Sequence, residues 1–302
     1  MLKRRDFLIA ASAATALITT SGMADATKAR RFDAVSRLRA LEKGNARLGV
    51  CLLDTVTGEV TGNRMDERFA MCSTFKLAMV AAVLREADRG RLSLAEIIPY
   101  TKSDLLEWAP ITEENLSKGG MSIAALAQAA QELSDGTAAN LLVKRLGGPA
   151  AVTAKFREMG DNVSRLDRYE PDLGLVLSAD HRDTTTPLGY AQLVRRLTTG
   201  NVLRRESRER LVGWMQDTKT GVRRLRAGLP ADWRTGNKTG TGRTEGTTNK
   251  CNDVAISFPP GKSPIIIASY FDSGEYTPQT EHRHEAVLAE VAKIAAQWAV
   301  SN

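Results

Sequence analysis

The order of strand-like and helix-like segments along the chain constrains the fold most strongly. Two strand-like segments, residues 48–54 and 59–61, come early, and three more, residues 234–241, 254–258 and 265–271, come late. Short strands need partners before their apolar faces can be buried. We therefore expect the early and late strands to build one antiparallel sheet, with the middle of the chain inserted between them.

The middle of the chain has a helical pattern. Its apolar residues recur at helical spacing between glycine and proline breaks. The expected helices are residues 75–88, 123–131, 138–146, 150–159 and 188–198, with one more near each end at 32–42 and 284–300. We predict an α+β fold in which an antiparallel sheet flanked by terminal helices (residues 27–66 and 215–302) adjoins an all-helical lobe (residues 67–214). The active site is expected in the cleft between these two lobes.

The first 26 residues have the features of a cleaved export signal. Arg4-Arg5 precedes Phe7-Leu8 and a mildly apolar run at residues 9–20, and Ala24-Asp25-Ala26 has the small-x-small pattern of a cleavage site. The arginine pair resembles a twin-arginine signal and predicts a periplasmic or secreted protein, and a general secretory signal is the alternative. The apolar run is too short to span a bilayer, so no membrane anchor is expected.

Composition disfavours several other functions. The 302-residue chain has a net charge of +7, which becomes +6 once the first 26 residues are removed. Its basic residues are interspersed with acidic ones, without a long basic run, which disfavours nucleic-acid binding. The three cysteines form no C-x-x-C motif, and His282 and His284 face different sides of a helix. We expect no metal and no cofactor, and a monomer that acts on small molecules.

The first sign of chemistry is Ser73-Thr74-Phe75-Lys76 at the start of a predicted helix. Residues three apart share a helix face, so the amine of Lys76 can reach the hydroxyl of Ser73. A serine hydroxyl is a poor nucleophile unless a nearby base removes its proton, and a lysine whose pKa is lowered can do so. The pattern is common by chance, so its meaning depends on the rest of the chain.

Three further motifs accompany Ser73. They are Ser134-Asp135-Gly136 at a helix junction, Arg168-Tyr169-Glu170-Pro171-Asp172-Leu173 in a long predicted loop (residues 165–186, with a catalytic part at 165–183), and Lys238-Thr239-Gly240 on an expected edge strand. In order and spacing, the chain from about residue 32 to its end resembles the class A serine β-lactamases, whose motif set is Ser-x-x-Lys, Ser-Asp-Asn and Lys-Thr-Gly. The resemblance implies an enzyme that opens β-lactam rings through an acyl-enzyme.

The resemblance assigns a role to each motif residue. Ser73 would attack the lactam carbonyl, with the backbone N–H groups of Ser73 and Thr241 as the oxyanion hole. Glu170 would activate the water that hydrolyses the acyl-enzyme, and either Lys76 or Glu170 would be the base for acylation. Ser134 would pass a proton to the leaving lactam nitrogen.

The resemblance also implies a set of substrate-binding and structural residues. The substrate-binding residues would be Trp108, Gly136, Arg224, Lys238, Thr239, Gly240 and Thr241. Lys238 would lower the pKa of Ser134 and attract the substrate carboxylate. Arg224, rather than its neighbour Arg223, would supply a guanidinium to the same carboxylate. Arg168 and Asp183 would form the ion pair that pins the neck of the loop.

The sequence departs from the family pattern at several positions. Gly136 stands where most members have an asparagine, which we expect to leave room in the cleft. Gly174 stands where many members have an asparagine that helps to hold the hydrolytic water, so deacylation is expected to be slower for bulky substrates. The hairpin at residues 243–250 is longer than usual, and through it a Cys72–Cys251 disulfide is conceivable if the two Cα atoms come within about 7 Å.

Two other functions share part of the motif set. A penicillin-binding D,D-peptidase has the serine, lysine and Lys-Thr-Gly motifs, but the carboxylate of Glu170 has no equivalent purpose there. A β-lactam-binding protein would acylate without efficient turnover, and Gly174 keeps that alternative open.

Overall fold

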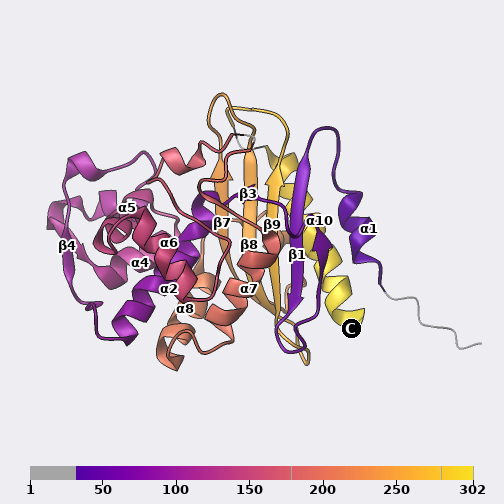
Figure 1. The fold of residues 1–302 in the computed structure, drawn as a ribbon, viewed down its shortest axis with the longest axis horizontal. Helices are drawn as coiled ribbons and strands as arrows, with labels where there is room; N and C mark the ends of the chain where they lie inside the picture. The colour runs from indigo at the N-terminus through magenta and orange to yellow at the C-terminus, as the bar shows by residue number, and fades with distance from the viewer. Residues whose placement is uncertain (1–31, 178, 280, 302) are drawn as a thin grey trace, which may run out of the picture. The chain divides into compact units, whose positions relative to one another are not determined.

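The computed structural model describes residues 32–177, 179–279 and 281–301, and five of its strands form one antiparallel sheet in the order β2-β1-β9-β8-β7 (Figure 1). Their bounds are β1 Arg47–Asp54, β2 Val60–Asn63, β7 Arg234–Gly242, β8 Lys250–Phe258 and β9 Ile265–Asp272. The early strand β1 pairs along its whole length with the late strand β9, from Arg47 opposite Asp272 to Asp54 opposite Ile265. The prediction that early and late strands share one sheet is therefore confirmed.

Both faces of the sheet are buried, each against a different set of elements. On β1, Leu48, Val50 and Leu52 pack on the side of the terminal helices, whereas Cys51 and Leu53 belong to the core shared with the central helices. The terminal set consists of α1 Ala34–Arg39, α9 Leu225–Gly228 and α10 His282–Ser301. Because successive strand residues point to opposite faces, a strand buried on both sides is a continuous apolar run.

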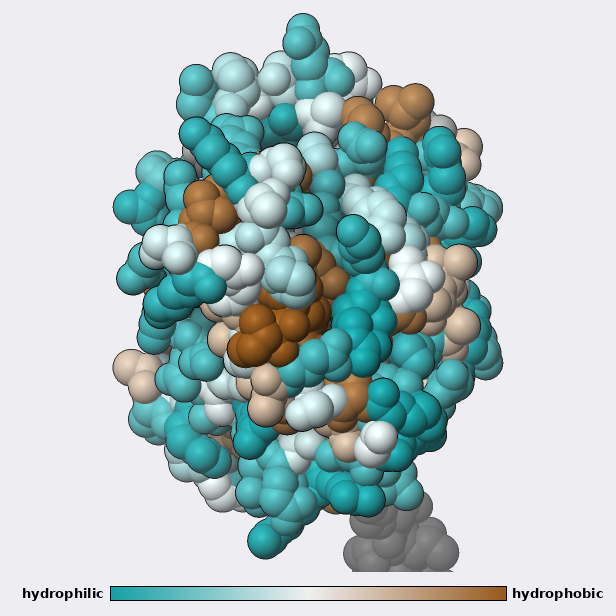
Figure 2. All heavy atoms as spheres, turned by 90° about the vertical axis from the view of Figure 1, so that its left-hand side faces the viewer, coloured by the Kyte–Doolittle hydropathy of each residue, from teal (hydrophilic) through white to brown (hydrophobic). Residues whose placement is uncertain are grey.

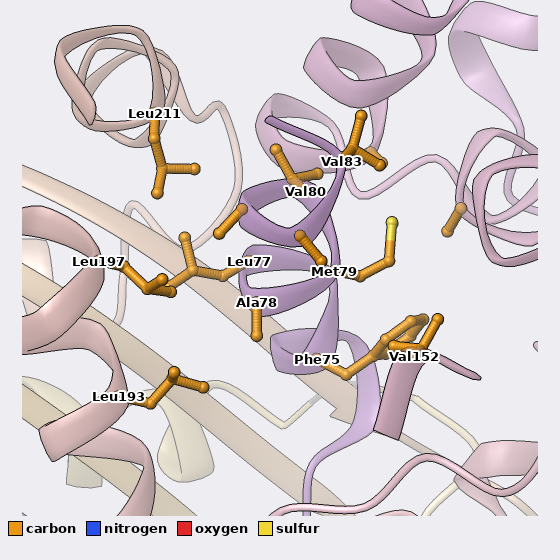
Figure 3. Close-up of a cluster of buried hydrophobic side chains, with 14 of the residues drawn as sticks. Phe75, Leu77, Ala78, Met79, Val80, Val83, Val152, Leu193, Leu197 and Leu211 are labelled. Atoms are coloured by element: carbon orange, nitrogen blue, oxygen red, sulfur yellow. The ribbon is translucent and has the colours of Figure 1, made fainter. Parts of the chain in front are cut away.

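The helical region is built around a central helix, α2. The helices of this region are α2 Phe75–Asp88, α3 Pro110–Glu114, α4 Ile123–Glu132, α5 Gly136–Arg145, α6 Pro149–Glu158, α7 Pro187–Thr198 and α8 Arg205–Asp217. Every side chain of α2 from Phe75 to Glu86 is buried. Figure 3 shows its side chains among Val152 of α6, Leu193 and Leu197 of α7 and Leu211 of α8. A helix that is enclosed on all sides is a rigid support for residues at its N-terminus.

Most of the described helices lie on the β7 side of the sheet, and α1 and α10 lie on the opposite side (Figure 1). Helix α7 instead packs on β1 and β9 and closes one face of the sheet. It came from the segment predicted as an all-helical lobe, yet it shares a core with the strands. Residues from Phe32 onward form one compact unit, so the division into two lobes stays a prediction.

Several elements differ from the sequence expectations. Helix α1 is shorter than expected at both ends: the side chain of Asp33 caps its start by accepting from Ser36 N at 3.0 Å, and the helix ends at Arg39. Helix α8 was not predicted, since its many charged residues obscure the apolar repeat. The paired strands β3 Phe69–Ala70 with β6 Thr184–Thr185, and β4 Ile97–Pro99 with β5 Gly120–Ser122, were also not predicted, because segments of two or three residues carry no period.

Figure 2 shows the face formed by the helical region, which is mostly hydrophilic, with a compact hydrophobic patch near its centre and smaller hydrophobic groups elsewhere. Among the described residues, no helix combines the length and apolar character needed to cross a membrane. The predicted export signal, residues 1–26, lies outside the described part of the chain.

Candidate active site

The nucleophile candidate, Ser73, lies in a short 3₁₀ turn, η1 Cys72–Thr74, that leads directly into α2. Cys72 and Thr74 on either side of it are buried, whereas Ser73 is only half-buried. Its hydroxyl donates a hydrogen bond to Glu170 Oε1 at 2.7 Å. The serine proton therefore points at a carboxylate oxygen, which is the geometry that general-base activation requires.

Lys76 lies one turn further along the helix and is fully buried. Its Nζ donates to the carbonyl of Ser134 at 2.7 Å and lies 2.9 Å from Glu170 Oε1. We expected a direct contact between Lys76 and Ser73, but here both bind the same oxygen of Glu170. A charge-assisted bond to a carboxylate is stronger than one to a neutral hydroxyl, which accounts for this arrangement.

Glu170 is held in its charged form by these neighbours. Burial alone would raise the pKa of Glu170, but the charge and hydrogen bond of Lys76 and the hydrogen bond of Ser73 outweigh it, so the pKa is lowered. The backbone of Glu170 is bracketed by Asn140 of α5, whose Oδ1 accepts from Glu170 N at 3.0 Å and whose Nδ2 donates to Glu170 O at 2.9 Å. The carboxylate is thus ionised and fixed in position.

The loop that carries Glu170 is closed at its neck by an ion pair. Arg168 Nε lies 2.6 Å from Asp183 Oδ2, and Asp183 is fully buried. The other oxygen of Asp183 accepts from the backbone N–H groups of Asp167 at 2.7 Å and Arg168 at 3.1 Å. This contact joins the two ends of the loop beside the β3–β6 pair.

Ser134 lies between α4 and α5 with a positive φ of 59°, an uncommon conformation for a non-glycine residue. Its Oγ accepts from Lys238 Nζ at 2.9 Å, and Lys76 Nζ lies 3.4 Å away. Burial, and to a smaller extent the charge of Lys76, lowers the pKa of Lys238 well below its usual value. A lysine whose pKa is lowered gives up its proton more easily than an ordinary lysine, so it can exchange a proton with a neighbouring hydroxyl.

Gly136, the third residue of the second motif, does not leave the room that we expected. A Cβ added to it would lie 3.1 Å from Leu106 Cδ1 and 3.2 Å from the carbonyl oxygen of Trp108. The segment before α3 therefore fills the space that a longer side chain would take. Trp108 itself is 59% exposed, and its indole donates to the carbonyl of Leu133 at 2.9 Å, which holds it beside the Ser134 turn.

Strand β7 approaches the Ser73 turn very closely. A Cβ on Gly240 would lie 2.7 Å from the carbonyl oxygen of Met71, so only glycine fits there. This approach brings Lys238 and Thr241, from the edge of the sheet, to residues supplied by the helical region. The hydroxyl of Thr239 lies 2.8 Å from that of Thr220, outside this group.

Arg224 reaches the same strand from the turn before α9. It is buried, and its Nη2 donates to Thr241 Oγ1 at 2.7 Å while its Nη1 donates to the carbonyl of Gly240 at 3.1 Å. Its Nε lies 3.3 Å from Glu285 of α10. Arg223, in contrast, contacts the exposed ring of His282. The structure thus places Arg224, and not Arg223, beside the Lys238–Thr241 segment.

The conceivable Cys72–Cys251 disulfide is absent: all three cysteines are free and buried. Asn252 of β8 donates to the carbonyl oxygens of Ala70 at 2.9 Å and Met71 at 3.2 Å, so it faces the Cys72 turn. Its neighbour Cys251 must then point to the opposite face, where it packs in the core below α10. The sheet therefore separates the two sulfur atoms.

Asn140 is the site residue that the sequence did not assign. It belongs to the helix that follows Ser134-Asp135-Gly136, among alanine and leucine residues. A polar side chain in an otherwise apolar stretch of helix needs a partner, and this could have marked it as a positioning residue.

Comparison with known proteins agrees with this geometry. Residues 31–299 match the model of the Beta-lactamase enzyme family. The chain is 45% identical to beta-lactamase CTX-M-8 of Citrobacter amalonaticus, over 88% of this chain and 89% of that protein, and 42% identical to beta-lactamase OXY-1 of Klebsiella oxytoca, over 97% of each. A solved structure of an ancestral (GNCA) class A beta-lactamase superposes with a TM-score of 0.82 at 47% identity, covering 87% of this chain and 99% of that chain.

The chain belongs to the β-lactamase enzyme family and has the class A fold, an antiparallel sheet joined to a helical region.

Proposed function

We propose that this enzyme hydrolyses the amide bond of β-lactam antibiotics through an acyl-enzyme on Ser73. The observation that carries the proposal is the 2.7 Å hydrogen bond from Ser73 Oγ to an ionised Glu170. Ser73 attacks the lactam carbonyl while its proton passes to Glu170, to which it already points. The backbone N–H groups of Ser73 and Thr241 stabilise the developing oxyanion.

Ring opening also needs a proton at the lactam nitrogen. Ser134 supplies that proton and is recharged through Lys238 or Lys76, the two amines nearest its hydroxyl. Lys76, 2.9 Å from Glu170 Oε1, takes up the proton that Glu170 received from Ser73, so the amines regain their proton and the carboxylate is ionised again before deacylation. Lys238 and Arg224 attract the substrate carboxylate, and Trp108 forms one wall of the binding site. Arg168 and Asp183 keep the loop, and with it Glu170, in register.

Deacylation uses the same carboxylate. Once Ser73 is acylated it has no proton to donate, so Glu170 can accept a proton from water. The resulting hydroxide attacks the ester carbonyl, the bond to Ser73 Oγ breaks, and the proton returns from Glu170 to that oxygen. We further propose export to the periplasm by the twin-arginine route and action as a monomer without a cofactor, on the basis of the N-terminal sequence and composition.

The test is steady-state hydrolysis of a chromogenic cephalosporin by the mature protein, compared with cleavage of a D-alanyl-D-alanine peptide. Sustained turnover of the cephalosporin with no peptide cleavage is the expected result. A single stoichiometric burst would indicate a binding protein, and peptide cleavage with a persistent penicillin adduct would indicate a D,D-peptidase.

A further inference from the structure

The two oxygen atoms of the Glu170 carboxylate have different surroundings. Oε1 is bound by both Ser73 and Lys76, whereas Oε2 has no hydrogen-bond partner among the described residues. A water that gives a proton to this carboxylate needs further polar partners to be held in place, since ordered waters usually make two to four hydrogen bonds.

The backbone after Glu170 forms a tight helical turn. Leu173 N donates to the carbonyl of Tyr169 at 3.1 Å, and Gly174 N donates to that of Pro171 at 3.0 Å. The turn is a 3₁₀ helix, Asp172–Gly174, that follows Glu170 and Pro171 directly. The hairpin after β7 begins beside the Ser73 turn, because a Cβ on Gly242 would lie 3.0 Å from Cys72 Sγ, and Ser73 itself binds Glu170.

The side of Gly174 from which a side chain would project is open apart from one polar atom, which belongs to that hairpin. The nearest atom to a Cβ built on Gly174 is Thr244 Oγ1, at 3.6 Å, and no other atom outside the adjoining residues comes within 4 Å. The φ of Gly174 is not in the left-handed region, so the backbone conformation does not require glycine here. The missing side chain leaves a space that is bordered by a threonine hydroxyl.

Thr244 lies in the hairpin between β7 and β8, and its backbone is fixed. Its carbonyl accepts from Thr247 N at 3.0 Å and from Thr247 Oγ1 at 2.7 Å. Its own hydroxyl makes no hydrogen bond to any described residue. A hydroxyl offers one donor and two acceptor sites, so this one is free to bind a water in the space beside Gly174.

We propose that Thr244 is a positioning residue for deacylation: its hydroxyl holds, across the gap left by Gly174, the water from which Glu170 takes a proton. The inference rests on the proposed hydrolysis of an acyl-enzyme at Ser73. Thr244 gains and loses no proton overall; it accepts or donates one hydrogen bond while the water proton moves to Glu170. The longer hairpin thereby supplies from outside the loop a polar group that position 174 lacks.

The experiment separates acylation from deacylation by rapid quench and intact mass spectrometry with a cephalosporin. Thr244→Val keeps the shape of the side chain but removes the hydroxyl. We expect it to lower the deacylation rate three- to tenfold, the loss of one ordinary hydrogen bond, with less than a twofold change in the acylation rate. Thr244→Ser, the matched control, should deacylate like the wild type. Gly174→Asn placed in the Thr244→Val background should restore much of the loss, because its amide enters the same space.

Deacylation by Thr244→Val at the wild-type rate would overturn the inference, as would an equal loss in Thr244→Ser, which would indicate a packing role. If Thr244→Val folds poorly, Thr244→Ala also removes the hydroxyl and does not add the extra methyl group of valine. The same fall in the deacylation rate is expected for it. A wild type that never releases its acyl group would instead refute the proposed function, so the two failures are distinguishable.

Discussion

Replacement of Asp183 by asparagine should destabilise the fold by about 2–3 kcal/mol. Asp183 is fully buried and binds Arg168 Nε at 2.6 Å, while its other oxygen accepts from two backbone N–H groups. Asparagine can keep these two backbone bonds, and it tolerates the positive φ of 55° at this position. The change therefore removes the charge, and it places an NH₂ donor opposite the Nε–H of Arg168, so the hydrogen bond between these two side chains is lost as well.

The size of this loss of stability depends on the contacts that Arg168 keeps after the substitution. Removal of one partner from a buried ion pair costs about 3–5 kcal/mol. Arg168 is 19% exposed and keeps a weaker contact with Asp180 at 3.8 Å and a hydrogen bond to the carbonyl of Leu175 at 2.9 Å, so the cost is expected below that range. Because the loop carries Glu170, the rate of hydrolysis should fall as well.

The assay is equilibrium unfolding in urea, followed by tryptophan fluorescence and far-ultraviolet circular dichroism. The matched control is Arg165→Ala, which breaks an ion pair with Asp167 in the same loop. Arg165 is 43% exposed, and an exposed pair contributes less than about 1 kcal/mol. If Asp183→Asn were as stable as the wild type, or cost no more than Arg165→Ala, the reasoning about the loop neck would be refuted.

Three other changes test different parts of the structure. Asn140→Leu removes both hydrogen bonds to the Glu170 backbone and, at about 1 kcal/mol per bond, should slow hydrolysis about tenfold or more. Asn140→Asp keeps the acceptor and should lose less activity. Equal hydrolysis rates for the two variants would contradict the positioning role of Asn140. Burial raises the pKa of Asp253 to about 6, so between pH 4 and 7 the folded state holds a proton that the unfolded state has released. The stability of the wild type relative to Asp253→Asn should therefore fall by roughly 2.4 kcal/mol as the pH rises from about 4 to 7. Urea unfolding at both pH values tests this, and a constant difference would contradict it. Burial also raises the pKa of the three thiols to about 11 or 12, so the folded protein should resist alkylation by iodoacetamide at pH 8. Unfolding without reductant should expose three cysteines that can be alkylated. A single alkylated cysteine would show that the other two form a disulfide.

The elements that the sequence predicts best are those with a long, unbroken pattern. Helix α2 has the predicted bounds because its apolar residues run unbroken from Leu77 to Leu84 and no glycine or proline interrupts its 14 positions. Strand β9 is a nearly continuous apolar run because both of its faces are covered. The short strands β4 and β5 and the charged helix α8 lack such patterns. Their formation depends on tertiary contacts that no local window contains.

In the active site, too, some features could be predicted from the sequence and others could not. The motifs identify Ser73, Glu170 and Lys238 through a resemblance, and the structure brings all three together. The space at Gly136 could not be predicted, because it is filled by Leu106, which lies 30 residues away in the chain. The separation of the two cysteines could have been predicted from strand alternation, had the start of β8 been placed at Lys250 rather than at Val254.

The measurement that tests the central claim most directly is intact mass spectrometry of the wild type and of Glu170→Ala during reaction with a cephalosporin, with peptide mapping of any adduct. The account predicts free enzyme and sustained hydrolysis for the wild type, and in the variant a persistent acyl group on Ser73. A persistent adduct in the wild type, an adduct on another residue, or turnover by Glu170→Ala at the wild-type rate would contradict it.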